Sequence, residues 1–271
     1  DLGMIHYVDS EEEWEQIQHS EYLDYVMELK KSGVIRHIGM SSHNPKVAVK
    51  AAECGYVEMI LFSINPAFDM LPASEDIDTM FAEEFDAGLR GIDADRARLY
   101  KVCEQNDVGI TVMKGFAGGR LFDEKRSPFG VKLTPVQCIH YALTRPAVGS
   151  IMCGYDTKEQ VDEAVAYEHA SEEEKDYASV IANAPFHSYR GECTYCGHCK
   201  PCVVNLDIAM INKFYDLATM QPAVPQTVQS HYGLLEHQAS ECIGCHACEP
   251  RCPFGVPIAE RMTKTAQLFG C

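Results

Sequence analysis

Cysteine is the residue type whose number and spacing in this sequence point most directly to chemistry. The chain of 271 residues contains 13 cysteines, and most of them fall in two short windows, CTYCGHCKPC and CIGCHACEPRCP. Thiols at such density, in a chain without an export signal, favour metal binding over a set of disulfides. The cysteines of the two windows are Cys193, Cys196, Cys199 and Cys202, followed by Cys242, Cys245, Cys248 and Cys252.

The second window has the spacing C-x2-C-x2-C-x3-C-P, which is typical of bacterial [4Fe–4S] sites. A cubane offers four irons at the corners of a tetrahedron, and a short looping chain can bring three thiolates onto three of them. The fourth cysteine commonly binds a different cluster, and Pro253 turns the chain away after it. The first window, C-x2-C-x2-C-x2-C, is tighter and lacks the proline. Together the windows predict two [4Fe–4S] clusters held by these eight cysteines.

Zinc is the main alternative metal for these windows. Structural zinc takes four thiolates, usually as two C-x2–4-C pairs separated by a longer spacer, and neither window has that form. Disulfides within the windows would be strained at these spacings. Iron–sulfur clusters therefore fit both windows better than zinc or disulfides do.

The composition narrows the class of protein further. There are 40 acidic and 23 basic side chains, for a formal net charge of −17, which argues against binding to the phosphates of nucleic acid. No apolar run approaches the roughly 18 residues of a transmembrane helix, and the acidic opening is unlike a signal peptide. We therefore expect a cytoplasmic protein that binds neither nucleic acid nor a membrane.

Ahead of the cysteine windows, short apolar runs alternate with amphipathic stretches, as they do in parallel β/α units. Helix starts are expected where Thr134 precedes Pro135, and at the capping boxes that begin at Thr157 and Ser171. The expected strands are Leu2–Ile5, Val34–Met40, Val57–Ile64, Val108–Met113 and Val148–Met152. The expected helices between them include Glu21–Lys31, Pro45–Cys54, Ala94–Asn106 and Pro135–Leu143.

Five such units suit either an open doubly wound sheet or part of an eight-fold barrel. The dinucleotide fingerprint G-x-G-x-x-G is missing after the first strand, which weakens the open-sheet alternative. A barrel takes about 250 residues, whereas about 185 precede the windows. We expect an α/β fold in which residues 1–185 form a (β/α)8 TIM barrel that lacks its N-terminal units. Residues 186–271 are expected to form a small, mostly α-helical two-cluster ferredoxin-type domain, with a helix at Asp207–Met220 between the windows.

Several segments resemble the aldo/keto reductase family in the order in which that family has them. DLGMIHYVDS resembles the fourth barrel strand, and GVIRHIGMSSHNP resembles the signature around the fifth. ITVMKGFAGGRL resembles the seventh strand with its cofactor loop, and LTPVQCIHYALTRPAVGSIMCGYDTKEQVDEAV resembles the segment that follows, through the final cofactor loop. With the cysteine windows appended, the chain resembles the branch of this family that carries a ferredoxin-type domain.

The resemblance implies a catalytic role for His6, which ends the first expected strand and matches the family histidine that orients a carbonyl substrate. The family's catalytic Asp, Tyr and Lys belong to segments ahead of the first residue here, so the fragment is expected to be inactive alone. The alternative for His6 is a surface or packing role.

The resemblance also implies a nicotinamide cofactor, NAD(P)H. Ser41 and Ser42 stand where the family places a Ser-Asn pair that binds the carboxamide, so Ser42 is a departure. Leu61 stands where the family has a glutamine, and Asn65 is a candidate substitute. The alternative is that these polar residues only cap strands and helices. Candidates for binding the phosphates and the adenosine end are Gly115, Gly118, Gly119, Arg120, Gly154, Thr157 and Gln160.

A connection after the third expected strand, Ser74–Asp86, carries six acidic side chains and is either a lid over the active-site face or a solvated helix.

The sequence thus predicts an oxidoreductase with a barrel that binds nicotinamide and a small carbonyl substrate, and with two clusters that pass electrons to a possible redox partner protein. Hydride chemistry moves two electrons together whereas a cluster takes one, so the clusters serve either as a path to a partner or as structure. The alternatives are an electron-transfer protein with a catalytically degenerate barrel and, less favoured, a protein stapled by zinc.

Overall fold

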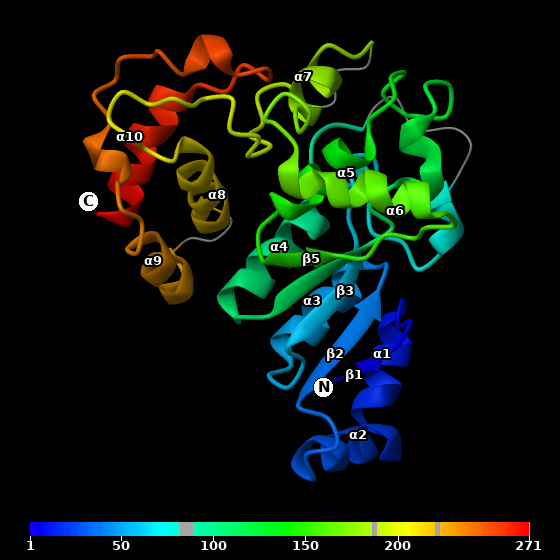
Figure 1. The fold of residues 1–271 in the computed structure, drawn as a ribbon. Coiled ribbons are helices and arrows are strands. Elements are labelled where there is room, and N and C mark those ends of the chain that lie inside the picture. Colours follow the sequence, from blue (N-terminus) through cyan, green and yellow to red (C-terminus); the bar gives the residue numbers. More distant parts are fainter. Residues whose placement is uncertain (82–88, 186–188, 220–222, 271) are drawn as a thin grey trace.

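The computed structural model describes residues 1–81, 89–185, 189–219 and 223–270 (Figure 1). We call the part up to Ala182 the first segment and the part from Tyr189 onward the second segment. The first segment is built on five parallel strands in the spatial order β1-β2-β3-β4-β5. All five predicted strands are present, with bounds that differ by a few residues. The strands are β1 (Leu2–Ile5), β2 (His37–Ser42), β3 (Met59–Ser63), β4 (Gly109–Met113) and β5 (Val148–Ile151).

The strand order identifies the sheet as part of a barrel. Each strand pairs in parallel with the next one along the chain, so every crossover advances in the same direction. Right-handed crossovers of this kind place all the connecting helices on one face of the sheet, whereas a doubly wound sheet reverses direction once. The predicted partial (β/α) barrel is therefore confirmed over these five units.

The two faces of the sheet differ in burial, as a barrel wall requires. On the helix-covered face, side chains such as Ile38, Phe62 and Val112 are fully buried. The opposite face carries Thr111 and Ser150, whose hydroxyls lie 2.9 Å apart at an exposed position. Strand side chains alternate between faces, so the apolar core lies between the sheet and its helices.

The helices of the first segment begin largely where local capping chemistry predicts. Thr134 and Gln137 form a capping box with Pro135 in the first turn of its helix. Ser10 and Glu13 form another box, which starts a helix that the sequence analysis missed. The helices are α1 (Glu11–Gln18), α2 (Glu21–Lys31), α3 (Pro45–Glu53), α4 (Ala94–Gln105), α5 (Pro135–Leu143), α6 (Lys158–Val165) and α7 (Tyr177–Ala182).

The helix start predicted at Ser171 is wrong. Ser171 and Glu174 exchange the hydrogen bonds of a capping box, with Glu174 Oε2 accepting from the Ser171 backbone at 2.8 Å. The residues after them form a turn, and α7 begins only at Tyr177, where Asp176 is the N-cap. The box satisfies the local donors, but a turn separates it from the helix.

The acidic connection is only partly visible in the structure. Its described part, up to Phe81, contains a short 3-10 helix at Ile77–Phe81 and a turn in which Asp76 accepts the Asp78 backbone N–H at 2.9 Å. Residues 82–86 of the predicted lid or helix lie outside the described residues.

The second segment is helical in the part that the structure describes, as predicted. It contains α8 (Ile208–Thr219) between the cysteine windows, then α9 (Gln226–Tyr232) and α10 (Ile258–Phe269). Helix α10 packs on α8, and long loops carry the cysteines around this pair (Figure 1). No strand occurs in residues 189–219 or 223–270.

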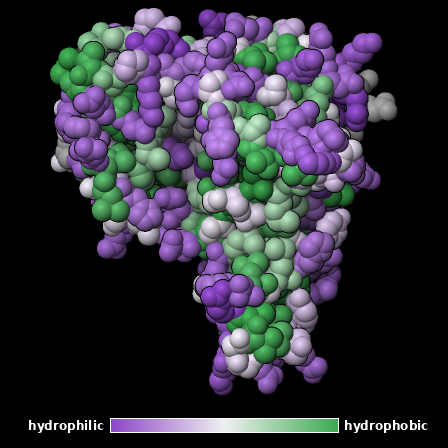
Figure 2. All heavy atoms as spheres, viewed as in Figure 1, coloured by the Kyte–Doolittle hydropathy of each residue, from purple (hydrophilic) through white to green (hydrophobic). Residues whose placement is uncertain are grey.

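Hydrophilic side chains cover much of the molecular face shown in Figure 2. Among the described residues, no helix is both long enough and apolar enough to span a bilayer.

Candidate functional site

The cysteines of the two windows line two separate cavities in the second segment. We call them the inner cavity and the outer cavity. The inner cavity is lined by Cys193, Cys196, Cys199 and Cys252. The outer cavity is lined by Cys242, Cys245, Cys248 and Cys202. Each cavity thus takes three cysteines from one window and the fourth from the other, which is the exchange that a two-cluster arrangement requires.

The two windows reach this arrangement with the same backbone turns. In the first window Tyr195 and Gly197 have positive φ, at 58° and 83°. In the second window Gly244 and His246, at the equivalent positions, have φ of 64° and 56°. A left-handed residue other than glycine costs about 1–2 kcal/mol, so the strain at Tyr195 and His246 marks a loop shape that both windows require.

The donor set fits a cluster better than a single ion. Among the described residues, no three Cys, His, Asp or Glu side chains converge closely enough to hold one metal ion. A zinc ion needs its four thiolates within about 2.3 Å of one point, whereas a cubane spreads its four cysteines around a larger body. Burial raises the pKa of the Cys193 thiol and raises that of Cys199 to about 12. At Cys196 burial acts in the same direction, but the hydrogen bonds from His198 outweigh it and leave the thiol pKa lowered.

Arg251, which lies between the last two cysteines of the second window, ties the windows together. One of its guanidinium nitrogens donates to the carbonyl of Cys199 at 2.7 Å and to that of Pro201 at 2.8 Å. The contact joins the loop of the inner cavity to residues that line the outer one, so the two cavities form one unit.

The inner cavity is also fastened to the barrel. The carbonyl of Thr194, in the first window, accepts a hydrogen bond from the Tyr177 hydroxyl at 2.6 Å and another from Arg145. His198 Nε2 lies 2.8 Å from Asp176 Oδ2, just ahead of α7. These bonds hold the first window against the ends of α5 and α7 of the barrel.

A third cavity, of about 590 Å³, lies at the carboxyl ends of β4 and β5 in the barrel. Gly118 and Gly119 adopt left-handed φ of 62° and 83° there, a conformation that other residues adopt at a cost. At Gly115 a Cβ would lie 2.5 Å from Ile151 Cδ1. Of the predicted cofactor residues, this cavity brings together Gly115, Gly118, Gly119, Gly154 and Gln160.

Charged residues of both signs line this barrel cavity. Lys114 follows β4, and burial lowers the pKa of its ammonium, while the nearby Asp9 carboxylate opposes the shift. Asp156 and Glu163 lie on the other side, at and beyond the end of β5. The cavity therefore offers glycine backbone N–H groups and one cation to an anionic ligand, with acids at its rim.

Two other predicted cofactor residues lie outside this lining. Thr157 caps α6, where its hydroxyl accepts the Gln160 backbone N–H at 3.3 Å. Arg120 is buried and donates to the carbonyls of Met80 and Arg126, each at 3.4 Å. Both have structural partners that explain their positions.

The predicted carboxamide-binding residues are buried and already hydrogen bonded. Ser41 Oγ accepts the Tyr7 backbone N–H at 2.7 Å. The amide of Asn65 donates to the Lys114 carbonyl at 2.9 Å, and its oxygen accepts from the backbone of Ala67 and Phe68. These side chains lie at strand ends and hold the backbone of neighbouring loops through their hydrogen bonds.

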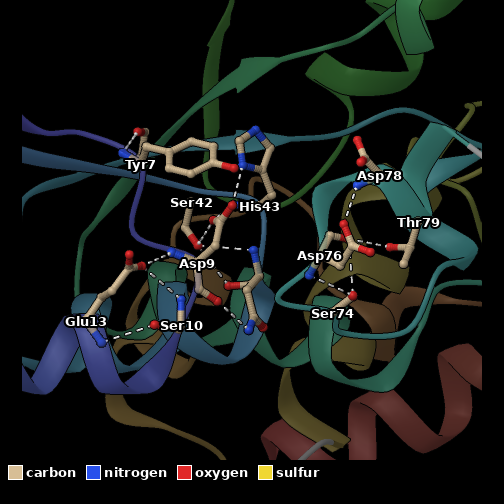
Figure 3. A network of polar contacts seen from close by, with 12 residues as sticks. Tyr7, Asp9, Ser10, Glu13, Ser42, His43, Ser74, Asp76, Asp78 and Thr79 are labelled. Carbon is tan, nitrogen blue, oxygen red and sulfur yellow. Dashed lines mark hydrogen bonds and ion pairs between the residues drawn. The ribbon is translucent and has the colours of Figure 1, made fainter.

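Asp9 and His43 form a buried pair that the sequence analysis did not find. The Asp9 carboxylate accepts from the Ser42 hydroxyl at 3.1 Å and from the His43 backbone at 2.6 Å, and it lies 2.8 Å from His43 Nδ1 (Figure 3). Burial alone would raise the pKa of Asp9, but the hydrogen bonds from His43 and Ser42 outweigh it and leave the pKa below its usual range. Because the partners lie more than 30 positions apart, no local pattern signals the pair.

His6, the predicted catalytic residue, is exposed just after β1. The ring of Tyr7, which has a left-handed φ of 63°, lies 6.3 Å from the His6 ring and 5.5 Å from that of His43. Both histidines thus lie beside Tyr7 at the carboxyl ends of β1 and β2, where barrels carry their chemistry.

Comparison with protein families agrees with both segments. Residues 1–182 match the model of the aldo/keto reductase family, and the chain belongs to that family. Residues 192–257 match the model of a 4Fe-4S dicluster domain. The protein is thus an iron–sulfur oxidoreductase of the aldo/keto reductase type. No curated protein matches the chain.

Proposed function

We propose that this protein couples a nicotinamide-binding barrel, acting on a small carbonyl compound, to two [4Fe–4S] clusters that carry single electrons to a redox partner. The observation that carries the proposal is the exchange of fourth cysteines between the two windows. It divides eight cysteines into two complete sets of four, each around its own cavity.

The cluster ligands follow from that division. The inner cluster is held by Cys193, Cys196, Cys199 and Cys252. The outer cluster is held by Cys242, Cys245, Cys248 and Cys202. Bound clusters supply one-electron transfer, with potentials that depend on the charges and hydrogen bonds around them.

The barrel cavity at the ends of β4 and β5 is the proposed site for NAD(P)H. Backbone N–H groups of its glycines, at Gly115, Gly118 and Gly119, and the Lys114 ammonium suit the pyrophosphate. Gly154 and Gln160, which line the same cavity, are proposed to hold the adenosine end. Ser41, Ser42 and Asn65 are proposed to lie toward the nicotinamide end. Arg120 and Thr157, which lie outside the lining of the cavity, are proposed to support its loops.

His6 is proposed to orient the carbonyl oxygen of the substrate. It is exposed at the carboxyl end of β1, and an imidazole N–H there can donate to that oxygen. A nicotinamide bound in the barrel cavity would supply the hydride for reduction of that carbonyl.

Helix α5 links the two kinds of site. Pro135, at its start, lines the barrel cavity, and the helix ends at Leu143, two residues before Arg145, which contacts the first window. A helix of nine residues is about 14 Å long. Since hydride carries two electrons, a group that splits the pair is needed between the sites, and a flavin is the chemical class with that capacity.

Metal and sulfide analysis tests the proposal. Anaerobically purified protein is expected to contain about eight iron and eight sulfide per chain, with no zinc. About two zinc and no sulfide would instead show that the second segment holds structural zinc sites. Calorimetric titration with NADPH and NADH tests whether the barrel binds a nicotinamide cofactor.

A second candidate function is electron transfer with a barrel that serves only as a scaffold. The observation that favours it is the burial of Ser41, Ser42 and Asn65, whose polar atoms already bind other parts of the chain. This candidate predicts full iron content without nicotinamide binding. Calorimetric binding of NADPH that is lost in Gly118→Val, but kept in Gly55→Ala at a helix end remote from the cavity, would exclude it.

A further inference from the structure

Arg145 is a buried cation without a close carboxylate partner. Its residue is 1% exposed, and no carboxylate of the described residues lies within 4.0 Å of its guanidinium. One nitrogen, Nη1, is buried without a hydrogen-bond partner in the described part of the chain. Buried charges are ordinarily paired because desolvation is costly. Asp69 and Asp216 act on this charge at longer range, and each accepts a hydrogen bond from a tyrosine that the guanidinium lies over, Tyr141 and Tyr195. The guanidinium thus has no anion bonded to it directly.

The contacts of Arg145 point to the inner cavity. Nη2 donates to the carbonyl of Thr194, and the guanidinium lies over the rings of Tyr141, at 4.3 Å, and Tyr195, at 4.9 Å. Thr194 and Tyr195 follow Cys193 directly and both line the inner cavity. The cation is thus bonded to one lining residue of the inner cavity and lies over the ring of another.

The other fully buried arginine of the barrel provides a contrast. Arg96 is 0% exposed and also belongs to the polar network around Asp69, but its Nη1 lies 3.8 Å from that carboxylate. Its remaining bonds go to the carbonyls of Leu71 and Ser63, far from the cysteine windows in sequence. Its Nη2, like Nη1 of Arg145, is buried without a hydrogen-bond partner among the described residues, so the difference between the two arginines lies in the carboxylate. Arg96 is therefore a buried arginine with an anionic partner inside the barrel.

We infer that Arg145 is the counter-ion of the inner cluster and a positioning residue for the first window. The inference rests on the proposed function, since it requires a cluster in the inner cavity. A cubane held by four thiolates is anionic, and each electron that it accepts adds a negative charge. A buried cation beside it favours the reduced form, so Arg145 raises the reduction potential of the inner cluster relative to a neutral residue.

The outer cavity has a different environment. Arg251 lines it but donates to backbone carbonyls of the first window and borders on solvent. Cys245 and Ile243 at that cavity are exposed, so water screens charges there. Arg145 therefore sets the order of the two potentials, with the inner cluster as the better electron acceptor on the side of the barrel.

The test compares Arg145→Gln and Arg145→Lys with the matched pair Arg96→Gln and Arg96→Lys. Iron and sulfide are counted in each protein, and both midpoint potentials are measured by EPR-monitored redox titration. A Cys245→Ser background, which perturbs the outer site alone, assigns the two signals. Arg145→Gln is expected to shift the inner midpoint to more negative potential and leave the outer one in place, while Arg145→Lys stays near the parent value.

Loss of the inner cluster alone in Arg145→Gln, with iron halved, would also support the inference if Arg96→Gln keeps its full iron. An unmoved inner midpoint in Arg145→Gln at full iron content would overturn it. Equal changes in the Arg145 and Arg96 variants would overturn it too, because they would reflect general damage to the core. Parent protein without iron and sulfide would refute the proposed function itself, and the inference with it.

Discussion

The inner and outer cavities have the same kind of lining and different surroundings. Each takes four cysteines, and each is wrapped by a window with left-handed residues at the same two positions. The inner cavity is packed against the barrel, and Cys199 there is buried. The outer cavity faces outward, with Ile243 at 66% and Val203 at 64% exposure beside it.

Two sites with the same cysteine spacing can thus differ in burial and in their contacts. The difference comes from the part of the chain that packs against each site. The inner site has its loop carbonyl held by Tyr177 and Arg145 of the barrel, so it belongs to the barrel's rigid core. The outer site presents the apolar side chains of Ile243 and Val203 to solvent.

The crosswise cysteines give the sharpest test of the comparison. Cys202→Ser is expected to remove the outer cluster although Cys202 belongs to the first window, and Cys252→Ser is expected to remove the inner one. Each variant should fall from about eight to about four iron per chain. Hydrogen exchange should rise around residues 242–248 in the first variant and around residues 193–199 in the second.

Cys54→Ser is the control, since Cys54 lies at the end of α3, outside both windows. It should retain the full iron content. If Cys202→Ser instead loosened residues 193–199 and spared 242–248, each window would hold its own cluster, and the distinction between inner and outer sites would need to be redrawn.

Removal of Asp69 should weaken the inner site's support within the barrel. Asp69 is fully buried and accepts hydrogen bonds from the hydroxyls of Tyr100, at 2.6 Å, and Tyr141, at 2.7 Å. Asp69→Ala leaves Arg96 without its partner, so we expect a loss of about 3–5 kcal/mol in the free energy of unfolding. Urea unfolding, followed by the fluorescence of the single tryptophan, Trp14, measures it.

Asp78→Ala, at an exposed position, is the matched control and should change stability little. The Asp69 variant should also increase exchange around residues 193–199 more than around 242–248, because Tyr141 forms one face of the Arg145 site. Equal loosening of both windows would show that the two cavities depend on the barrel alike.

Much of this architecture could be predicted because it depends on local patterns. Helix α5 begins and ends at the predicted residues, since Thr134, Pro135 and Gln137 specify its start within four positions. The parallel strands were visible as apolar runs, and the cysteine spacing indicated two iron–sulfur sites. Features of this kind depend on residues within a few positions of one another.

The remainder depends on contacts between residues far apart in the chain. The bond from Arg145 to Thr194 joins positions 49 apart, and the pair of Asp9 and His43 joins positions 34 apart. At Ser171 the local pattern was present but misleading. The predicted capping box forms with Glu174, but a turn follows it instead of a helix. The sequence pattern located candidate side chains, but only packing decides which of them meet.

The Asp9–His43 pair tests whether the barrel can be weakened without affecting either cluster site. Asp9→Asn removes the acceptor of the His43 and Ser42 bonds, so we expect a cost of about 2 kcal/mol at pH 7. Because the pKa of Asp9 is lowered in the folded protein, its stabilisation is present above the ordinary Asp pKa of 3.8 and is lost as the pH falls below it. The gap between parent and variant should therefore narrow on acidification.

Urea midpoints from Trp14 fluorescence between neutral and acid pH measure this gap, and cluster absorbance at neutral pH should be the same in both proteins. Glu12→Gln, an exposed acid on the neighbouring helix α1, is the control. A gap that stays constant with pH would mean that the Asp9 carboxylate is not the stabilising group.

The smallest expected effect is that of Tyr177→Phe, which removes one of the two donors to the Thr194 carbonyl. Arg145 still donates to that oxygen, so the free energy of unfolding should fall by only about 1 kcal/mol. Tyr100→Phe is the matched control, because its buried hydroxyl binds Asp69 and has no bond to the windows. Both variants should lose similar stability in urea, but only Tyr177→Phe should increase exchange around residues 193–199. If both increased it equally, the inner window would owe its order to the barrel core as a whole rather than to the bonds at Thr194.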